Sequence, residues 1–142
     1  MKRAVILVLL MLASLLVACQ PSDSPEKAAR EWVEASLNYD GNKMAQRTCT
    51  ALQEELQNQA LLLSAFAALG QMYTGQQTQG DISELHFETL NRSGDTAQVR
   101  VTGEIHVAVL AFSQAEQVDE TWRMIREDGK WKWCGLADIP IQ

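Results

Sequence analysis

The hydrophobic period of this 142-residue chain changes from helical to alternating at Asp81, and no other feature constrains its fold as strongly. Before Asp81, apolar residues recur at the i, i+3, i+4 spacing of amphipathic helices. After it, apolar and polar residues alternate almost to the end of the chain, as they do in half-buried strands. This order predicts an α+β domain in which N-terminal helices pack on a curved antiparallel sheet of about four strands.

Two helical stretches are expected in the first half of the chain. Ser24 is a favourable N-cap, so a first helix should begin directly after it and run to about Tyr39. A second stretch starts near Lys43, and its apolar pattern continues to Tyr73. Segment 74–80 is polar and bounded by glycine, which predicts a loop.

The second half of the chain predicts four strands separated by turn-forming residues. Alternation is clearest in the second of them, where one face is apolar and the other is polar. An Asp-Gly pair at 128–129 predicts a tight hairpin before the last strand. Residues 112–116 are predicted to be a loop. The four strands cover residues 85–90, 97–107, 119–126 and 130–136.

The first nineteen residues have the arrangement of an export signal. Lys2 and Arg3 precede an apolar run that ends at Leu16-Val17-Ala18-Cys19. The run is shorter than the roughly 20 apolar residues that a membrane span needs. The last four residues resemble the lipobox of bacterial lipoproteins. This resemblance implies that the chain is cleaved before Cys19 and that Cys19 carries lipid.

A chain processed in this way has a signal peptide at 1–18, a lipidated tether at 19–24 and one domain at 25–142. The resemblance implies attachment to the cell membrane or the outer membrane through the N-terminal lipid, facing outside the cytoplasm. Removal of Lys2 and Arg3 leaves 10 basic and 18 acidic residues, a formal charge of −8. That balance argues against nucleic acid as a partner.

Two cysteines remain when Cys19 is lipidated, and an even pair in an oxidising compartment predicts a Cys49–Cys134 disulfide. Two free thiols, a metal site and a catalytic thiol are the alternatives. A metal site needs more ligands than two cysteines and two histidines offer at recognisable spacing, so no metal or other cofactor is expected. Simple alternation turns Cys134 away from Trp131 and Trp133. The bridge therefore requires a bulge there or a helix that wraps the sheet edge.

Four segments carry a second resemblance. They are Ala29 to Ala35, Tyr39 to Asn42, Gly94 to Val99 and Arg126 to Lys132. Together they resemble the NTF2-like superfamily of cone-shaped α+β domains, in the form found in lipoproteins. The resemblance implies a cystatin-like cone of helices on a curved sheet. That scaffold carries isomerases, dehydratases, binders of small ligands and domains without chemistry.

NTF2-like domains often dimerise through the open sheet face, so the resemblance implies a possible homodimer. The polar face of the strand at 97–107 is then the candidate interface, and Arg100, Glu104 and His106 lie on it. A second constellation is aromatic: Trp122, Trp131 and Trp133 fall on paired strands and should gather. They form either core against the first helix or an aromatic wall that faces a ligand.

No glycine-rich phosphate loop, HExxH pair or GxSxG motif occurs in the chain. Asp40 lies at a helix end beside a glycine, where aspartate is usually a cap or turn residue rather than a base. The sequence therefore favours a noncatalytic domain that binds a small ligand or an envelope protein. The alternative is an enzyme, of isomerase or dehydratase type, that acts on a small apolar substrate in the cone. An enzyme requires an ionisable pocket group with a shifted pKa, whereas a binder does not.

Overall fold

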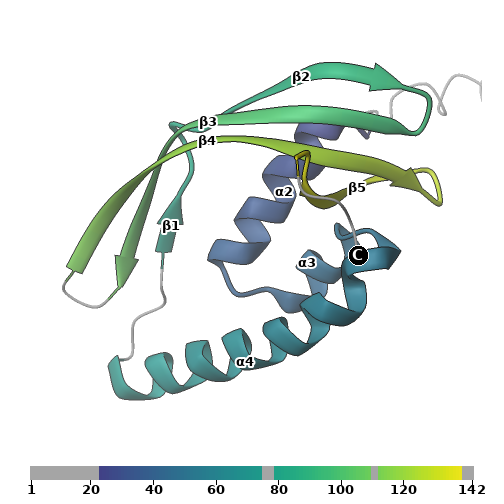
Figure 1. Ribbon diagram of the computed structural model, residues 1–142. Coiled ribbons are helices and arrows are strands. Elements are labelled where there is room, and N and C mark those ends of the chain that lie inside the picture. Colours follow the sequence, from purple (N-terminus) through teal and green to yellow (C-terminus); the bar gives the residue numbers. More distant parts are fainter. Residues whose placement is uncertain (1–22, 75–78, 110–111, 139–142) are drawn as a thin grey trace, which may run out of the picture.

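A computed structural model describes residues 23–74, 79–109 and 112–138, and Cys19 lies outside them. In these residues the chain forms three helices and a five-stranded antiparallel sheet, which confirms the predicted α+β class with one strand more than expected. Figure 1 shows the sheet curving over helix α2, with helix α4 on the side of α2 that faces away from the sheet. Within the described residues, no helix is long and apolar enough to cross a membrane.

Helix α2, Pro25–Leu37, begins where the sequence predicts. The hydroxyl of Ser24 accepts a hydrogen bond from the backbone N–H of Lys27 at 3.2 Å and caps the helix. The helix ends earlier than expected, because Tyr39 adopts a left-handed conformation with φ of 53°.

The second predicted helical stretch is in fact two helices, α3 at Gly41–Gln46 and α4 at Thr50–Thr74. The periodicity argument placed Cys49 inside a helix, and this is wrong. Backbone hydrogen bonds of 2.7 and 2.9 Å join residues 47 and 49 to Trp133 instead. Pairing with the last strand, which is an edge of the sheet, satisfies backbone groups that a continuous helix would otherwise use.

All strand pairs in the sheet are antiparallel, and the long third strand is its centre. Strands β1 and β2 pair with different parts of the same edge of β3. On the other edge of β3 lies β4, and β5 pairs with β4. The strands are β1 (Gln79–Asp81), β2 (His86–Ser93), β3 (Thr96–Val109), β4 (Phe112–Glu127) and β5 (Lys130–Leu136).

At two places, residues predicted to be loop lie in strands: the last two of segment 74–80, and all of 112–116. Residues 79–81 pair with β3 as β1, and residues 112–116 continue β4 in unbroken register with β3 as far as the Val109–Phe112 pair. Residues 113–116 are exposed. A strand without a buried side shows no alternation of apolar and polar residues, so its sequence resembles a loop.

The core lies between α2 and the inner face of the sheet. Ala28 and Ala29 of α2 are fully buried, and so are Val99 of β3, Met124 of β4 and Trp131 of β5. The small alanine side chains allow the helix backbone to approach the sheet closely. The clear alternation predicted for β3 is confirmed, because its apolar side chains supply the inner face.

The β4–β5 hairpin turns at Asp128 and Gly129, which both have positive φ, as the Asp-Gly pair predicts. The hairpin also caps α4. The carboxylate of Glu127 accepts hydrogen bonds from the backbone N–H and hydroxyl of Thr50 at 3.1 and 2.8 Å, and from Lys132 Nζ at 3.0 Å. Desolvation opposes the charge of Glu127, but these bonds outweigh it and lower its pKa. The first turn of α4 is thus fastened to the hairpin.

Candidate functional site

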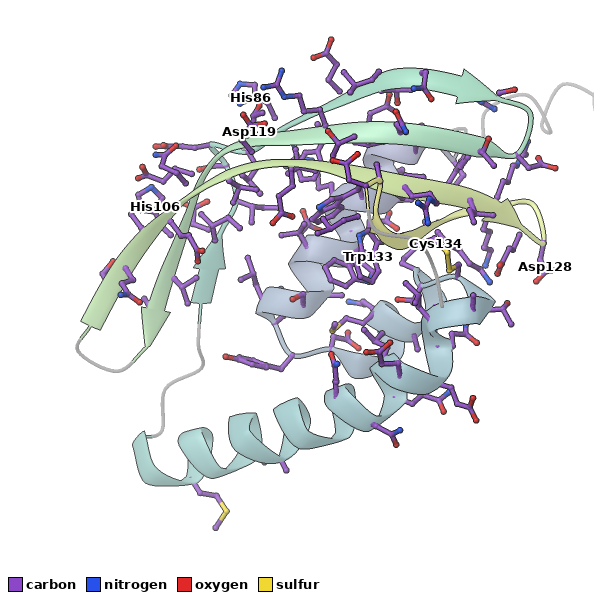
Figure 2. The ribbon with its side chains drawn as sticks, viewed as in Figure 1. His86, His106, Asp119, Asp128, Trp133 and Cys134 are labelled. Carbon is purple, nitrogen blue, oxygen red and sulfur yellow. A yellow bond between two sulfur atoms is a disulfide. The ribbon has the colours of Figure 1, made fainter. Side chains whose placement is uncertain are left out.

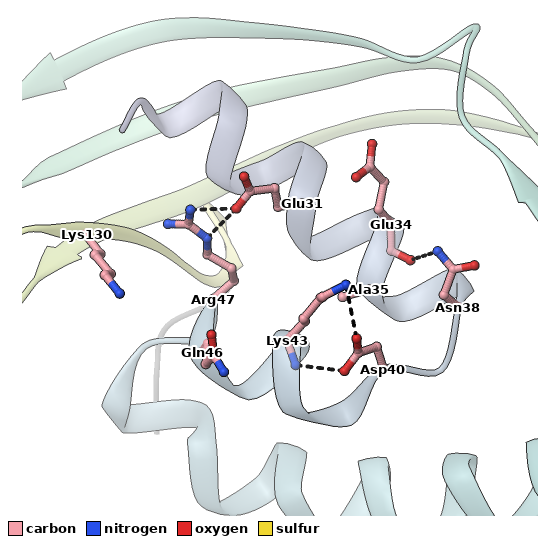
Figure 3. A pocket seen from close by; sticks show the side chains of 9 residues that line it. All are labelled: Glu31, Glu34, Ala35, Asn38, Asp40, Lys43, Gln46, Arg47 and Lys130. Atoms are coloured by element: carbon pink, nitrogen blue, oxygen red, sulfur yellow. Dashed lines mark hydrogen bonds and ion pairs between the residues drawn. The ribbon is translucent and has the colours of Figure 1, made fainter. Parts of the chain in front are cut away.

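A pocket of about 420 Å³ lies between the C-terminal half of α2, helix α3 and the start of β5 (Figure 3). This volume falls in the range of about 300 to 1,000 Å³ that is usual for small-molecule sites. Its lining carries three acidic and three basic side chains, so it is polar and contains both signs of charge. The lining residues are Glu31, Glu34, Ala35, Asn38, Asp40, Lys43, Gln46, Arg47 and Lys130.

Arg47 forms one wall of the pocket, and all three nitrogens of its guanidinium have partners. Nε and Nη2 contact Glu31 Oε2 at 2.7 and 2.5 Å. Nη1 lies 3.1 Å from both carboxylate oxygens of Asp23, with the hydrogen bond to Oδ2, and it also donates to the carbonyl of Trp131 at 3.1 Å. Partial burial alone would lower the pKa of Arg47, but Asp23 and Glu31 outweigh it and raise that pKa. The charge of Arg47 is therefore compensated inside the protein.

Asp23 belongs to the segment that the sequence predicts as a tether. Its carboxylate accepts the backbone N–H of Trp131 at 2.7 Å as well as the guanidinium of Arg47. The end of this segment at Asp23 is consequently held against the domain, beside the pocket.

Asp40 caps helix α3, as expected for an aspartate at this turn. Its carboxylate accepts the backbone N–H of Lys43 at 3.1 Å, and the Lys43 ammonium lies 3.4 Å away. The hydrogen bond from the Lys43 N–H lowers the pKa of Asp40. A carboxylate whose charged form is stabilised in this way is a poor proton acceptor at neutral pH.

Glu34 and Lys130 differ from the other charged residues of the pocket. Within the described part of the chain, neither side chain has a hydrogen-bond or ion-pair partner, and the dashed line at Glu34 in Figure 3 joins its backbone carbonyl to the side-chain amide of Asn38. Gln46 adds an amide group that can both donate and accept. The pocket thus offers one carboxylate and one ammonium to a bound molecule.

The predicted disulfide is present between Cys49 and Cys134, which are both fully buried, with a Cα–Cα distance of 5.3 Å. Of the two alternatives considered for it, the bulge occurs, and a non-helical segment takes the place of the wrapping helix. The register of β5 shifts so that Cys134 and Gly135 face a single residue of β4, and Gly135 has φ of 87°. Residues 47–49 run along the edge of β5 and bring Cys49 within reach. The bridge therefore fixes the backbone next to Arg47.

Two of the three tryptophans predicted to gather do so. Trp122 and Trp133 contact Trp32 of α2, with ring centroids 5.5 and 4.2 Å apart. Trp131 is fully buried but makes no ring contact with another tryptophan of the described chain. It lies two residue pairs closer to the hairpin, where the guanidinium of Arg92 sits 4.9 Å from its ring centroid. No tryptophan lines the pocket, and the cluster packs as core against α2.

Arg100, Glu104 and His106 lie on the outer face of β3, as the alternation predicts. Arg100 makes two hydrogen bonds of 3.0 Å to Asp119 of β4. Glu104 accepts a hydrogen bond from Gln117 and lies 3.1 Å from Nε2 of His106. The Arg100–Asp119 pair is exposed, so it adds little stability. The interface role of this face stays a prediction.

The pocket was not expected from the sequence. Arg47 lies 16 residues from Glu31 and 24 from Asp23, and Lys130 comes from the far end of the chain. Only the Asp40–Lys43 pair could be expected from neighbouring residues. Aspartate is a common N-cap, and its negative charge is favourable beside the first turn of a helix.

Comparisons with known proteins give matches among solved structures alone. No protein-family model matches the chain, and no curated protein is similar to it. Among solved structures, a Xanthomonas campestris protein described as a candidate calcium/calmodulin dependent protein kinase II association domain has a TM-score of 0.47 and 14% identity. The match covers 86% of this chain and 95% of that one.

Proposed function

We propose that this chain is a lipid-anchored domain outside the cytoplasm that binds a small dipolar molecule without transforming it. By dipolar we mean a molecule with one cationic and one anionic group, such as an amino acid or a short peptide. The observation that carries the proposal is the pocket between α2 and α3, which presents both signs of charge.

The free charges of the pocket support this class of ligand. The other charged side chains of the lining are compensated by one another or by Asp23, whereas Glu34 and Lys130 are not. A ligand ammonium beside Glu34 and a ligand carboxylate beside Lys130 would compensate both in charge-assisted hydrogen bonds. Both side chains are exposed, so a ligand with one charge would make one of these bonds and leave the other side chain to water.

The fixed geometry of the pocket wall also supports binding. The Arg47 guanidinium is held by two carboxylates and a backbone carbonyl, and the buried disulfide lies two residues further along the chain. A wall that is ordered before the ligand arrives reduces the entropy lost on binding.

The pKa shifts of the pocket favour a binder over the alternative, an isomerase or dehydratase. An acid or base that works near neutral pH needs a carboxylate with a raised pKa or a base with a lowered one. In the pocket, the pKa of Asp40 is lowered and that of Arg47 is raised, so both groups keep their charge.

A titration of the mature protein with the twenty free amino acids and a set of dipeptides tests the pocket. We expect at least one of them to shift the backbone amide signals of Glu34, Asn38 and Lys130 in ¹⁵N–¹H spectra. Glu34→Gln and Lys130→Gln should each weaken that binding about tenfold, since each removes one charge-assisted hydrogen bond. Glu116→Gln, on an exposed part of β4, is the matched control and should bind as the wild type does. Equal binding by all four proteins would refute the pocket assignment.

Metabolic labelling with an alkyne analogue of palmitate tests the anchor. The wild-type protein should incorporate the label and sediment with membranes, whereas Cys19→Ser should incorporate none, because it lacks the thiol that the lipobox resemblance assigns to lipid. Cys49→Ser/Cys134→Ser controls for thiol reactivity and should remain labelled. Label on the Cys19→Ser chain would rule out lipidation at this residue.

A further inference from the structure

Three side chains that can bind a metal ion converge on the outer face of the sheet. Nε2 of His106 lies 3.1 Å from a carboxylate oxygen of Glu104 and 3.8 Å from one of Glu84, and the three ligand atoms are all within 4.8 Å of one another. Donors bound to one tetrahedral Zn²⁺ at about 2.0 to 2.2 Å stand about 3.4 Å apart. The free side chains are thus already close to the spacing that a shared ion requires.

The fold brings these three residues together from two places in the sequence. Glu104 and His106 are two residues apart on β3, so strand alternation puts them on the same face. Glu84 comes from the connection between β1 and β2, which crosses directly over Gly103. A Cβ atom at residue 103 would lie only 2.1 Å from the carbonyl oxygen of Glu84. The glycine therefore permits the close approach that delivers the third ligand.

A fourth residue orients the site. Gln117 lies opposite Glu104 in the β3–β4 ladder, and its side-chain amide donates a hydrogen bond to Oε2 of Glu104. This bond leaves Oε1 of Glu104 as the oxygen that faces His106. Partners of this kind fix the direction of a metal ligand and raise the affinity of the site.

The charge of the cluster favours a cation. Glu84 and Glu104 contribute two negative charges, and Asp81 lies directly opposite His106 in the β1–β3 ladder and adds a third. A divalent ion offsets two of these charges. Imidazole nitrogen together with carboxylate oxygen is a ligand set of Zn²⁺.

We propose that Glu84, Glu104 and His106 form a Zn²⁺ site on the outer face of the sheet, with water in the remaining coordination position. Glu84 is far from Glu104 and His106 in the sequence, and only the fold brings the three together. The spacing of residues in the sequence therefore did not predict the site. Figure 2 shows His106 at the end of the sheet opposite to Cys134 and the β4–β5 hairpin. The site is therefore separate from the pocket, and it stands or fails independently of the proposed function.

Calorimetric titration of the chelator-treated mature protein with ZnCl₂ tests the site, with the disulfide intact so that no thiolate competes for the ion. The wild-type protein should bind one equivalent. His106→Ala should lose at least about tenfold in affinity, because loss of a direct ligand costs no less than the loss of an outer partner. His86→Ala is the matched control, since it removes the other histidine of the chain, whose Nδ1 lies 3.2 Å from the backbone carbonyl of Glu84 and not from its carboxylate, and it should bind as the wild type does.

Glu84→Gln is a second variant that tests the site, and it changes a side chain that is not buried. The Glu84 side chain is 64% exposed, so its replacement should leave the far-ultraviolet circular dichroism unchanged while it weakens Zn²⁺ binding. A wild-type protein that takes up no Zn²⁺ would overturn the proposal. So would equal affinities in His106→Ala and His86→Ala, whether both are reduced or neither is.

Discussion

Replacement of Cys49 and Cys134 by alanine is expected to lower the free energy of unfolding by about 4 to 5 kcal/mol. The bridge joins residues 85 apart in sequence, and the chain-entropy account assigns a large stabilisation to a loop of this length. Both cysteines are fully buried, and the segment between α3 and α4 meets β5 beside them. Urea denaturation of the oxidised wild type and the double variant, followed by tryptophan fluorescence, measures the difference.

Reduction supplies the control for this experiment. A thiol reductant should lower the denaturation midpoint of the wild type toward that of the double variant, and it should leave the double variant unchanged. If the free energies of unfolding of the two proteins differ by less than about 1 kcal/mol, the bridge is not a main source of stability. The disulfide would then not be what holds the backbone beside Arg47 in place.

Arg47→Met is expected to cost about 2 to 3 kcal/mol of stability, although methionine keeps much of the length of the side chain. The substitution leaves the carboxylates of Asp23 and Glu31 facing each other without the cation between them, and it removes a donor from the carbonyl of Trp131. The Arg47 side chain is only 17% exposed, so water replaces these bonds poorly. Thermal and urea denaturation both report the loss.

Lys43→Met is the matched control for Arg47→Met. Lys43 lines the same pocket and also pairs with a carboxylate, but its side chain is 73% exposed. Its replacement should change stability by no more than about 0.5 kcal/mol, as is usual for an exposed pair. Similar losses in the two variants would mean that Arg47 acts as one surface charge among others rather than as the centre of a partly buried network.

The features that follow from local sequence are the ones predicted correctly. Ser24 caps α2, Asp128 and Gly129 make the hairpin, and the alternation in β3 marks its inner and outer faces. Each depends on a few neighbouring residues and on one physical preference. The Cys49–Cys134 bridge was predicted for a different reason: if Cys19 is lipidated in an oxidising compartment, two cysteines remain and one pairing is possible.

The features that were missed depend on contacts between distant residues. Pairing of residues 47–49 with the edge of β5 interrupts a helical pattern that no local residue interrupts. Residues 113–116 form a strand without a buried face, so their sequence carries no period. The pocket and the outer cluster join side chains such as Arg47 with Asp23 and Glu84 with His106. Such juxtapositions come from the topology of the sheet and the path of the helices.

Native mass spectrometry of the mature protein, exported with its cysteines intact, tests the central claim most directly. We expect a small polar molecule to be retained by the wild-type chain and lost from the Glu34→Gln/Lys130→Gln variant, since these two side chains hold the free charges of the pocket. A wild-type chain that carries no small molecule, or a variant that retains the same one, would contradict the assignment of the pocket as the ligand site.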